Sequence, residues 1–125
     1  MDEVQIREVI DLWEKAIQTG DMKGILANHT EDILMFDVPE PVQSKGIAEY
    51  EKTWNLFFQY ERPSSDAFVI EELRVTSGND VAFATGVLRI GGSKESICRL
   101  TLGLKKVLGK WIIAHEHHSA PHKLV

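Results

Sequence analysis

The chain has 125 residues, of which 43% are apolar and 26% charged, which fits one domain, residues 1–125, with its own hydrophobic core. Its formal net charge of −5, without a basic run, argues against a nucleic-acid or anionic-membrane partner. A lone Cys98 cannot form an internal disulfide, and no apolar run reaches the roughly 20 residues of a membrane span, so we expect a soluble cytoplasmic protein.

The chain is predicted to open with two helices. Residues 2–19 carry apolar side chains at three- and four-residue spacing, which is typical of an amphipathic helix. Gly20 supplies a stop for this helix. Asp21 is suited to cap a second, shorter helix that reaches about residue 28.

A short strand and a third helix follow. The apolar run at residues 33–38 predicts a strand, and it ends where two prolines, at positions 39 and 41, prevent regular pairing. After a loop to Gly46, residues 47–60 predict a helix whose aromatic side indicates deep burial. The apolar residues on that side are Ile47, Tyr50, Trp54, Phe57 and Phe58.

The rest of the chain is predicted to be strands and turns. The expected strands are residues 68–75, 81–90, 95–107 and a last one from residue 110. Short turns join them, so neighbouring strands are expected to pair antiparallel as a meander. Helices that precede a meander indicate an α+β domain, with a ligand cavity between the helices and one face of the sheet.

The last strand carries three histidines in four positions. Because side chains alternate across a strand, Trp111, Ile113, His115 and His117 are predicted to share one face, and Ile112, Ala114, Glu116 and His118 the other. If the first face is buried, His115 and His117 line the cavity. Glu116 and His118 are then expected to meet a partner subunit, and His29 is expected to cap the second helix.

This order of elements resembles the NTF2-like superfamily, which includes ketosteroid isomerase and SnoaL-like polyketide cyclases. The resemblance covers nearly the whole chain and implies a cystatin-like cone, with helices on a curved, mostly antiparallel sheet around a cavity. The motifs that carry it are Gly20-Asp21, Phe36-Asp37, the Pro-containing loop to Gly46, and Gly109-Lys110-Trp111. The closing His-x-His-x-Ser pattern is also similar to the association domain of calcium/calmodulin-dependent protein kinase II, an oligomerisation module.

Asp37 is the first candidate for catalysis. The resemblance implies that it occupies the place of the proton-shuttling Asp of ketosteroid isomerase, with Gly46 following nine positions later as in that family. A carboxylate that aromatic neighbours shield from water has a raised pKa, which suits a general base. The alternative is that Asp37 only caps its own Pro-bounded turn.

The remainder of the isomerase site does not match. The Tyr of the family's first helix aligns with Trp13, and residues 96–110 contain no Asp or Glu where the family carries a protonated acid. Arg99 and Thr101 stand in that region instead. If their strand face is inward, Arg99 is a cation suited to an enolate oxygen; if outward, it is an ordinary exposed Arg.

Three interpretations of His115 and His117 remain open. They could act as pocket donors or a base near Asp37, or as structural histidines at an interface. They could also bind a metal together with Asp37 or Glu116, but two histidines without a defined third ligand predict no metal site. The aromatic residues are core first, and those expected to line a cavity are Trp13, Tyr50, Trp54 and Phe58.

The sequence therefore predicts a small-molecule pocket in a homodimer, with no cofactor. The expected ligand is a hydrophobic small molecule with a polar or carbonyl end. If the protein is an enzyme, Asp37 abstracts a proton next to the carbonyl, while Arg99 and a histidine stabilise the enolate and Thr101 helps to bind it. The alternative is a non-catalytic ligand-binding or oligomerisation domain.

Overall fold

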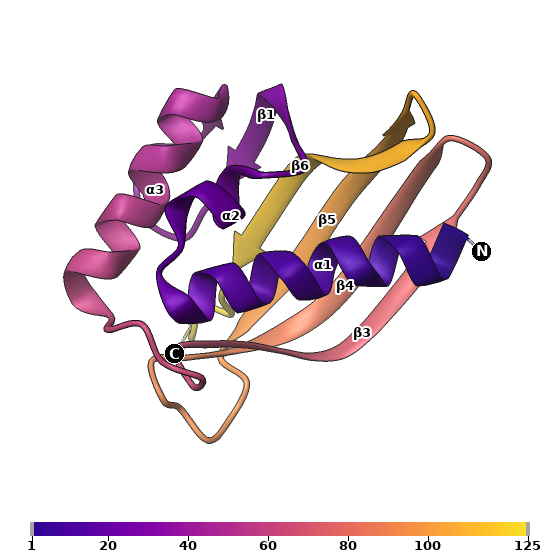
Figure 1. Cartoon of the computed structure of the whole chain (residues 1–125). Helices are drawn as coiled ribbons and strands as arrows, with labels where there is room; N and C mark the ends of the chain where they lie inside the picture. The colour runs from indigo at the N-terminus through magenta and orange to yellow at the C-terminus, as the bar shows by residue number, and fades with distance from the viewer. Residues whose placement is uncertain (1, 125) are drawn as a thin grey trace.

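In the computed structural model, which describes residues 2–124, three helices lie on one face of a six-stranded sheet (Figure 1). The helices are α1 (Asp2–Thr19), α2 (Met22–Leu26) and α3 (Ile47–Tyr60). The strands are β1 (His29–Phe36), β2 (Ser44–Lys45), β3 (Phe68–Ser77), β4 (Val81–Ile90), β5 (Cys98–Val107) and β6 (Lys110–Ser119). The expected α+β architecture with a mostly antiparallel sheet is confirmed.

The strand order places two distant parts of the chain side by side. The order across the sheet is β2-β1-β6-β5-β4-β3, and β3 to β6 form the expected antiparallel meander. β1 pairs with β6 in parallel, with Phe36 opposite His117. The residues that follow these two positions, Asp37 and His118, therefore lie close together at the ends of neighbouring strands.

The first two helices form as the sequence predicts. On α1, Ile6, Ile10 and Ile17 are fully enclosed, because the three- and four-residue spacing puts them on the side that faces the sheet. Gly20 ends the helix with a φ of 70°, a conformation that favours glycine. The Asp21 side chain accepts a hydrogen bond of 3.1 Å from the Gly24 amide and so caps α2.

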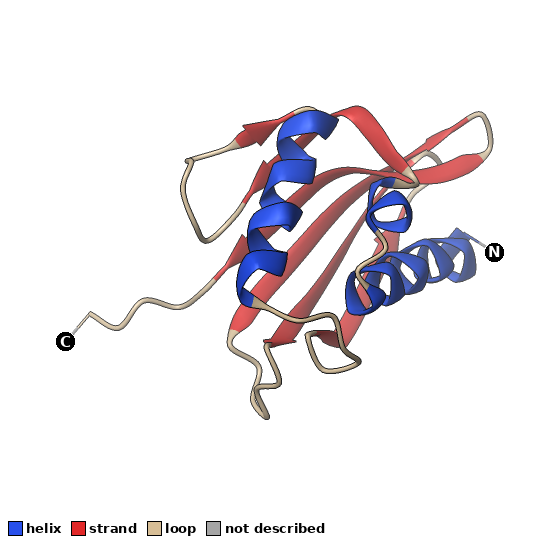
Figure 2. Ribbon diagram, turned by 60° about the vertical axis from the view of Figure 1, so that its left-hand side comes forward, coloured by secondary structure: helices blue, strands red, loops and turns tan. Residues whose placement is uncertain are grey.

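The helices cover only the inner face of the sheet (Figure 2). Leu100, Leu102 and Leu104 of β5 are buried against them, whereas Arg99 and Thr101 alternate to the outer face. In the part of the chain that the structure describes, no helix packs on that outer face. The cavity therefore lies between the inner face and the helices.

Several boundaries differ from the prediction by a few residues. β1 begins at His29 rather than residue 33, because His29 pairs with Ile113 of β6. β5 begins at Cys98 rather than residue 95, since the Ser93 side chain hydrogen-bonds both backbone groups of Glu95 and holds a turn there. The loop before Gly46 contains the two-residue strand β2, which pairs with β1.

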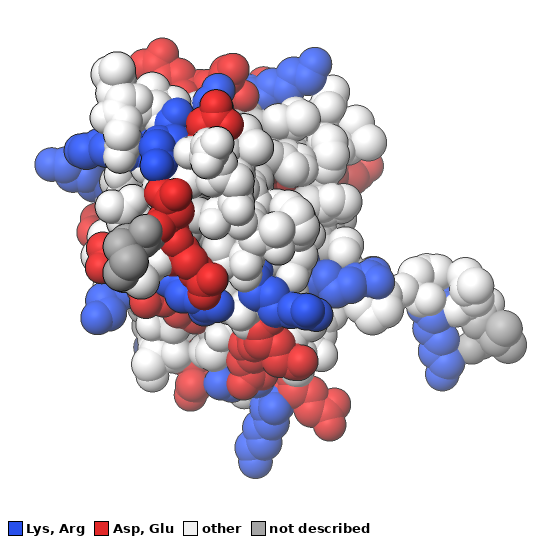
Figure 3. Space-filling view, turned by 90° about the vertical axis from the view of Figure 1, so that its right-hand side faces the viewer, with Lys and Arg blue, Asp and Glu red and all other residues white. Residues whose placement is uncertain are grey.

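The surface agrees with the mixed charge of the sequence. Figure 3 shows Lys and Arg interspersed with Asp and Glu on one side of the molecule, and the segment after β6 extending away from the body. Within residues 2–124, no helix has the length and apolar character required to cross a membrane.

Candidate functional site

A cavity of about 420 Å³ lies between α3 and the inner face of the sheet. Its walls are mainly apolar, and its polar side chains gather around the ends of β1 and β6 and the end of α3. The lining residues are Met35, Asp37, Val38, Pro39, Thr53, Trp54, Leu56, Phe57, Tyr60, Glu61, Phe68, Ile90, Ile97, Cys98 and His118. A concave apolar site with a few convergent polar groups is the usual form of a small-ligand site.

A bulge in β6 decides which of its histidines face this cavity. Gly103 of β5 pairs with His115 and Leu104 pairs with Ile113, so Ala114 is an extra residue without a partner on β5. The extra residue breaks the alternation of side chains. Trp111 and Ile113 before it, and Glu116 and His118 after it, all point to the inner face.

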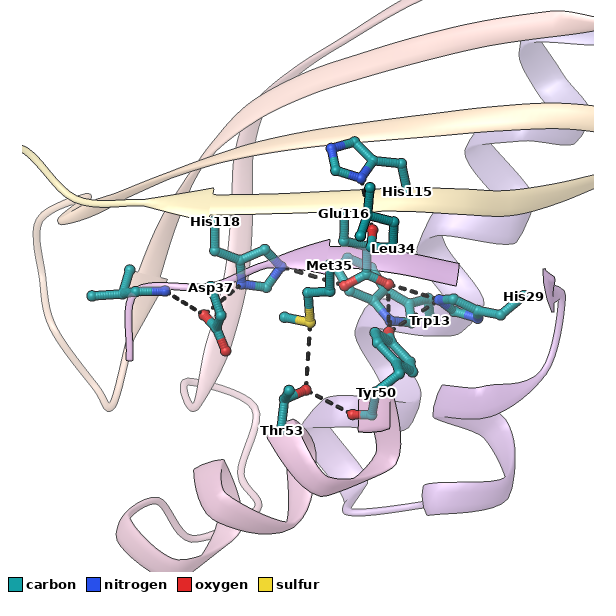
Figure 4. A network of polar contacts seen from close by, with 11 residues as sticks. Trp13, His29, Leu34, Met35, Asp37, Tyr50, Thr53, His115, Glu116 and His118 are labelled. Carbon is teal, nitrogen blue, oxygen red and sulfur yellow. Dashed lines mark hydrogen bonds and ion pairs between the residues drawn. The ribbon is translucent and has the colours of Figure 1, made fainter. Parts of the chain in front are cut away.

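Asp37 and His118 meet at one end of the cavity (Figure 4). Nδ1 of His118 lies 3.9 Å from Oδ1 of Asp37, and 24% of the Asp37 side chain is exposed against 8% of His118. Oδ1 also accepts a hydrogen bond of 2.8 Å from the Val38 amide, which fixes the carboxylate at the start of the Pro-bounded loop. Asp37 thus both caps its turn and faces the cavity.

Behind His118 lies a buried network centred on Glu116. One carboxylate oxygen of Glu116 is 2.7 Å from Nε2 of His29 and accepts a hydrogen bond from the Tyr50 hydroxyl. The other oxygen is 3.4 Å from Nε2 of His118. Trp13 donates a hydrogen bond of 3.0 Å to the Tyr50 hydroxyl, and Nδ1 of His29 lies 2.8 Å from the carbonyl of Ala27.

The protonation states in this network follow from its geometry. Burial raises the pKa of Glu116, but the hydrogen bonds from His118 and His29 outweigh it and bring the pKa down to about 2. Burial, and then the negative charge of Glu116, hold the pKa of Tyr50 well above its usual range. Glu116 is therefore an anion beside a neutral Tyr50 hydroxyl. Both ring nitrogens of His29 are engaged, Nδ1 with the Ala27 carbonyl and Nε2 with Glu116 and the Tyr50 hydroxyl.

Comparison with known proteins identifies the family. The model of the SnoaL-like domain matches residues 6–123. The chain belongs to the SnoaL-like family. An NTF2-like protein of unknown function from Pseudomonas putida is 30% identical, with a TM-score of 0.87 over 98% of this chain and 89% of that one. No curated protein sequence matches the chain.

Other solved structures share the fold of this SnoaL-like domain at lower identity. A candidate ketosteroid isomerase from Parabacteroides distasonis is 19% identical, with a TM-score of 0.72 over 94% of this chain and 88% of that one. A candidate dehydratase of the NTF2-like family from Streptomyces avermitilis is 15% identical, with a TM-score of 0.78 over 98% of this chain and 97% of that one. At these identities the similarity concerns the fold alone.

Several residues predicted for the site of this SnoaL-like domain do lie at the cavity or directly behind it. Asp37 and Trp54 line the cavity. Trp13 and Tyr50 are buried behind it, where they belong to the Glu116 network rather than to the wall. Phe58 packs against Trp54 without lining the cavity, and its neighbour Phe57 takes that place.

The prediction that His115 and His117 line the cavity is wrong. The bulge turns both rings to the outer face of the sheet, where each packs edge-on against Phe36, with ring centroids 4.9 and 5.3 Å apart. His115 also donates a hydrogen bond of 2.7 Å from Nδ1 to the carbonyl of Leu34. The sheet therefore separates these histidines from Asp37 and Glu116, so the alternative metal site that combined them is wrong as well.

Arg99 and Thr101 are also on the outer face. Nε of Arg99 donates a hydrogen bond of 3.1 Å to the Ser119 hydroxyl, and neither Arg99 nor Thr101 lines the cavity. The prediction that Arg99 stabilises an enolate is therefore wrong. The alternation of side chains along β5 did not decide which face of the strand points inward. The buried Leu100 and Leu102 occupy the inner face.

Sequence reasoning missed His118, Glu116 and His29. It assigned the first two to a subunit contact, because it assumed unbroken alternation along the last strand. It gave His29 only a capping role at the second helix, where Nδ1 does contact the Ala27 carbonyl, and missed its contact with Glu116. One signal was present: Gly103 stands inside a predicted strand, and an interior glycine is typical of a bulge or of a close approach. A Cβ atom at Gly103 would lie 3.3 Å from Cβ of His115, next to the bulge.

Proposed function

We propose that this SnoaL-like domain binds a small apolar molecule with a carbonyl end and transfers a proton at the carbon next to that carbonyl. The observation that carries the proposal is the contact between Asp37 and His118 at the end of an apolar cavity. Asp37 lies at the rim of both neighbouring cavities, and the Val38 amide fixes its carboxylate there, so it can reach a ligand that enters the apolar one.

The two residues would divide the reaction between them. Asp37 takes the proton from carbon, and the ring of His118 faces the oxygen on which negative charge develops. Its Nε2 faces Glu116, so Nδ1 is the ring nitrogen available toward the cavity. The 3.9 Å between Nδ1 and Asp37 is longer than a hydrogen bond, and catalytic contacts often tighten only when substrate binds.

Exchange of α-hydrogens tests this proposal. In heavy water, naphthyl methyl ketone should exchange its methyl hydrogens faster with the protein than without it. Asp37→Asn should lower the protein-dependent rate by about 100-fold or more, the usual contribution of a general base. Asp32→Asn, an exposed Asp of β1, is the matched control and should exchange like the wild type. Equal rates for Asp37→Asn and the wild type would remove Asp37 from the mechanism.

A second candidate is a non-catalytic ligand-binding or oligomerisation domain. The observation in its favour is that no Lys or Arg is among the described residues that line the cavity, so a fixed cation for an enolate oxygen is missing. In either case we propose a homodimer, because the outer face of the sheet carries exposed apolar side chains. An assembly larger than a dimer would favour the oligomerisation domain.

A further inference from the structure

Among the residues that the structure describes, the cavity lining contains acidic side chains but neither Lys nor Arg. Asp37 and Glu61 carry the two carboxylates in this lining. The second cavity, which shares Asp37 with the first, adds Glu40 and Glu49 against one cation, Lys52. An anionic ligand in the first cavity would therefore meet two carboxylates and, among the described lining residues, no Lys or Arg, which disfavours its binding.

Glu61 lies at the end of the cavity that is next to the C-terminus of α3. It is the residue directly after α3, and its amide donates to the carbonyl of Phe57, which closes the helix. Its carboxylate lies against Gly91: a Cβ atom at Gly91 would be 2.7 and 2.8 Å from the two oxygens. Within residues 2–124 its side chain has no hydrogen bond or ion pair, so its charge is not neutralised.

The position of Glu61 also runs against the helix dipole. The C-terminal end of a helix carries partial negative charge, and cationic side chains are the favoured ones there. α3 has no basic residue in its last turn and is followed by an acid. The carbonyl end of α3 and the Glu61 carboxylate thus both contribute negative potential at the cavity. This departs from the usual preference for cationic side chains at the C-terminus of a helix.

The rest of the wall suits a flat apolar ligand. Trp54, Phe57 and Phe68 contact one another edge-on, with ring centroids 5.3 to 6.4 Å apart, and all three line the cavity. These rings attract apolar surface and carry no charge of their own. None of these three residues has a positive charge that would compensate a negative group on the ligand.

We propose that the cavity selects uncharged ligands with a flat aromatic body and that Glu61 is the residue that rejects anionic ones. That such a ligand carries a carbonyl group is inferred from the proposed function, whereas the selection by charge is inferred only from the residues that line the cavity. Rejection of a wrong ligand by an unpaired charge is a common source of specificity. Carboxylates, phosphates and anionic thioesters are excluded as substrates on this basis.

A matched pair of probes tests the proposal. Naphthyl methyl ketone and naphthoate have the same number of non-hydrogen atoms and differ chiefly in charge. In titration calorimetry the ketone should bind the wild type at least about tenfold more tightly than naphthoate. Glu61→Gln should strengthen naphthoate binding several-fold and change ketone binding less than about twofold. Glu8→Gln, an exposed acid of α1 and the matched control, should change neither.

The indole N–H resonance of Trp54 locates the binding. It should shift when the ketone is added to the wild type, because Trp54 lines the cavity. Equal affinities for the two probes, an unchanged ratio in Glu61→Gln, or no binding of either probe would overturn the proposal. These outcomes are separate from the exchange test. A domain that prefers the ketone but does not exchange its hydrogens would contradict the proposed proton transfer and leave the selection by charge in place.

Discussion

The carboxylate of Glu116 has no exposed surface, and three side chains from three elements surround it. His29 stands at the start of β1, Tyr50 belongs to α3 and His118 to β6 itself. A buried charge is tolerated in a folded protein when it is paired: one oxygen of Glu116 has two hydrogen-bond partners, and the other has the His118 ring at 3.4 Å. Glu116 therefore ties these elements together and at the same time sets the orientation of the His118 ring toward the cavity.

Replacing Glu116 by Gln should destabilise the protein by about 3 kcal/mol or more at pH 7, because the histidines lose their charged partner while remaining buried. Urea unfolding monitored by tryptophan fluorescence measures the change. Glu8→Gln should unfold like the wild type, since Glu8 is exposed on α1. A loss below about 1 kcal/mol for Glu116→Gln would show that the network contributes little to the fold.

The pKa of Glu116 also predicts how stability depends on pH. It is about 2 in the folded protein and 4.5 in its ordinary state, so between these values protons bind the unfolded chain more readily. The stabilisation from Glu116 is thus fully present above about pH 4.5 and is lost as the pH falls toward 2. Its size is roughly 3 kcal/mol. Unfolding of Glu116→Gln should lack this part of the acid dependence; a slope equal to the wild type's would contradict it.

At the scale of elements, β5 and β6 show what the sequence could and could not predict. The alternation along β5 placed Leu100 and Leu102 on one face and Arg99 on the other, and the core then selected the inner face. On β6 the same rule failed, because one unpaired residue, Ala114, reverses the alternation. Pattern alone does not locate a bulge, since its position depends on the pairing with a neighbouring strand.

The candidate site, like the two strands, could be predicted only in part. Asp37 could be found because it ends a strand and begins a Pro-bounded loop, both of which are local signals. Its neighbour His118 could not, since their contact requires the parallel pairing of β1 with β6 and the bulge together. His29 lies 87 residues from Glu116 in the chain, and no local pattern links the two.

Because of the bulge, we expect two single-residue deletions in β6 to have different effects. Removing Ala114 should leave Ile113, His115 and Glu116 in regular alternation with their present partners, so the protein should still fold, with a loss of about 1–2 kcal/mol. Removing Ile112, which pairs with Lys105, should instead shift the register and turn Trp111 outward. Thermal unfolding by circular dichroism compares the two. Equal damage from both deletions would show that Ala114 is needed for the curvature of the sheet.

For the whole molecule, the two faces of the sheet have different surroundings. The helices cover the inner face, whereas Val81, Phe83 and Val107 on the outer face are 62%, 51% and 41% exposed. Phe83 lies opposite Gly103 on β5, so its ring has no cross-strand side chain on that side. Exposed apolar side chains grouped on one face indicate an interaction surface, and a second copy of the chain would present the same face.

Phe83→Lys should therefore dissociate the proposed dimer. Burying one Phe contributes about 1.5–3 kcal/mol, and a symmetric interface buries two, so the dissociation constant should rise by at least about 100-fold. Light scattering with size-exclusion chromatography should give twice 14.1 kDa for the wild type and 14.1 kDa for the variant. Leu12→Lys is the matched control, since Leu12 is 61% exposed on α1, away from the outer face. A monomeric wild type would contradict the proposed dimer, and a variant that stays dimeric would place the contact on another surface.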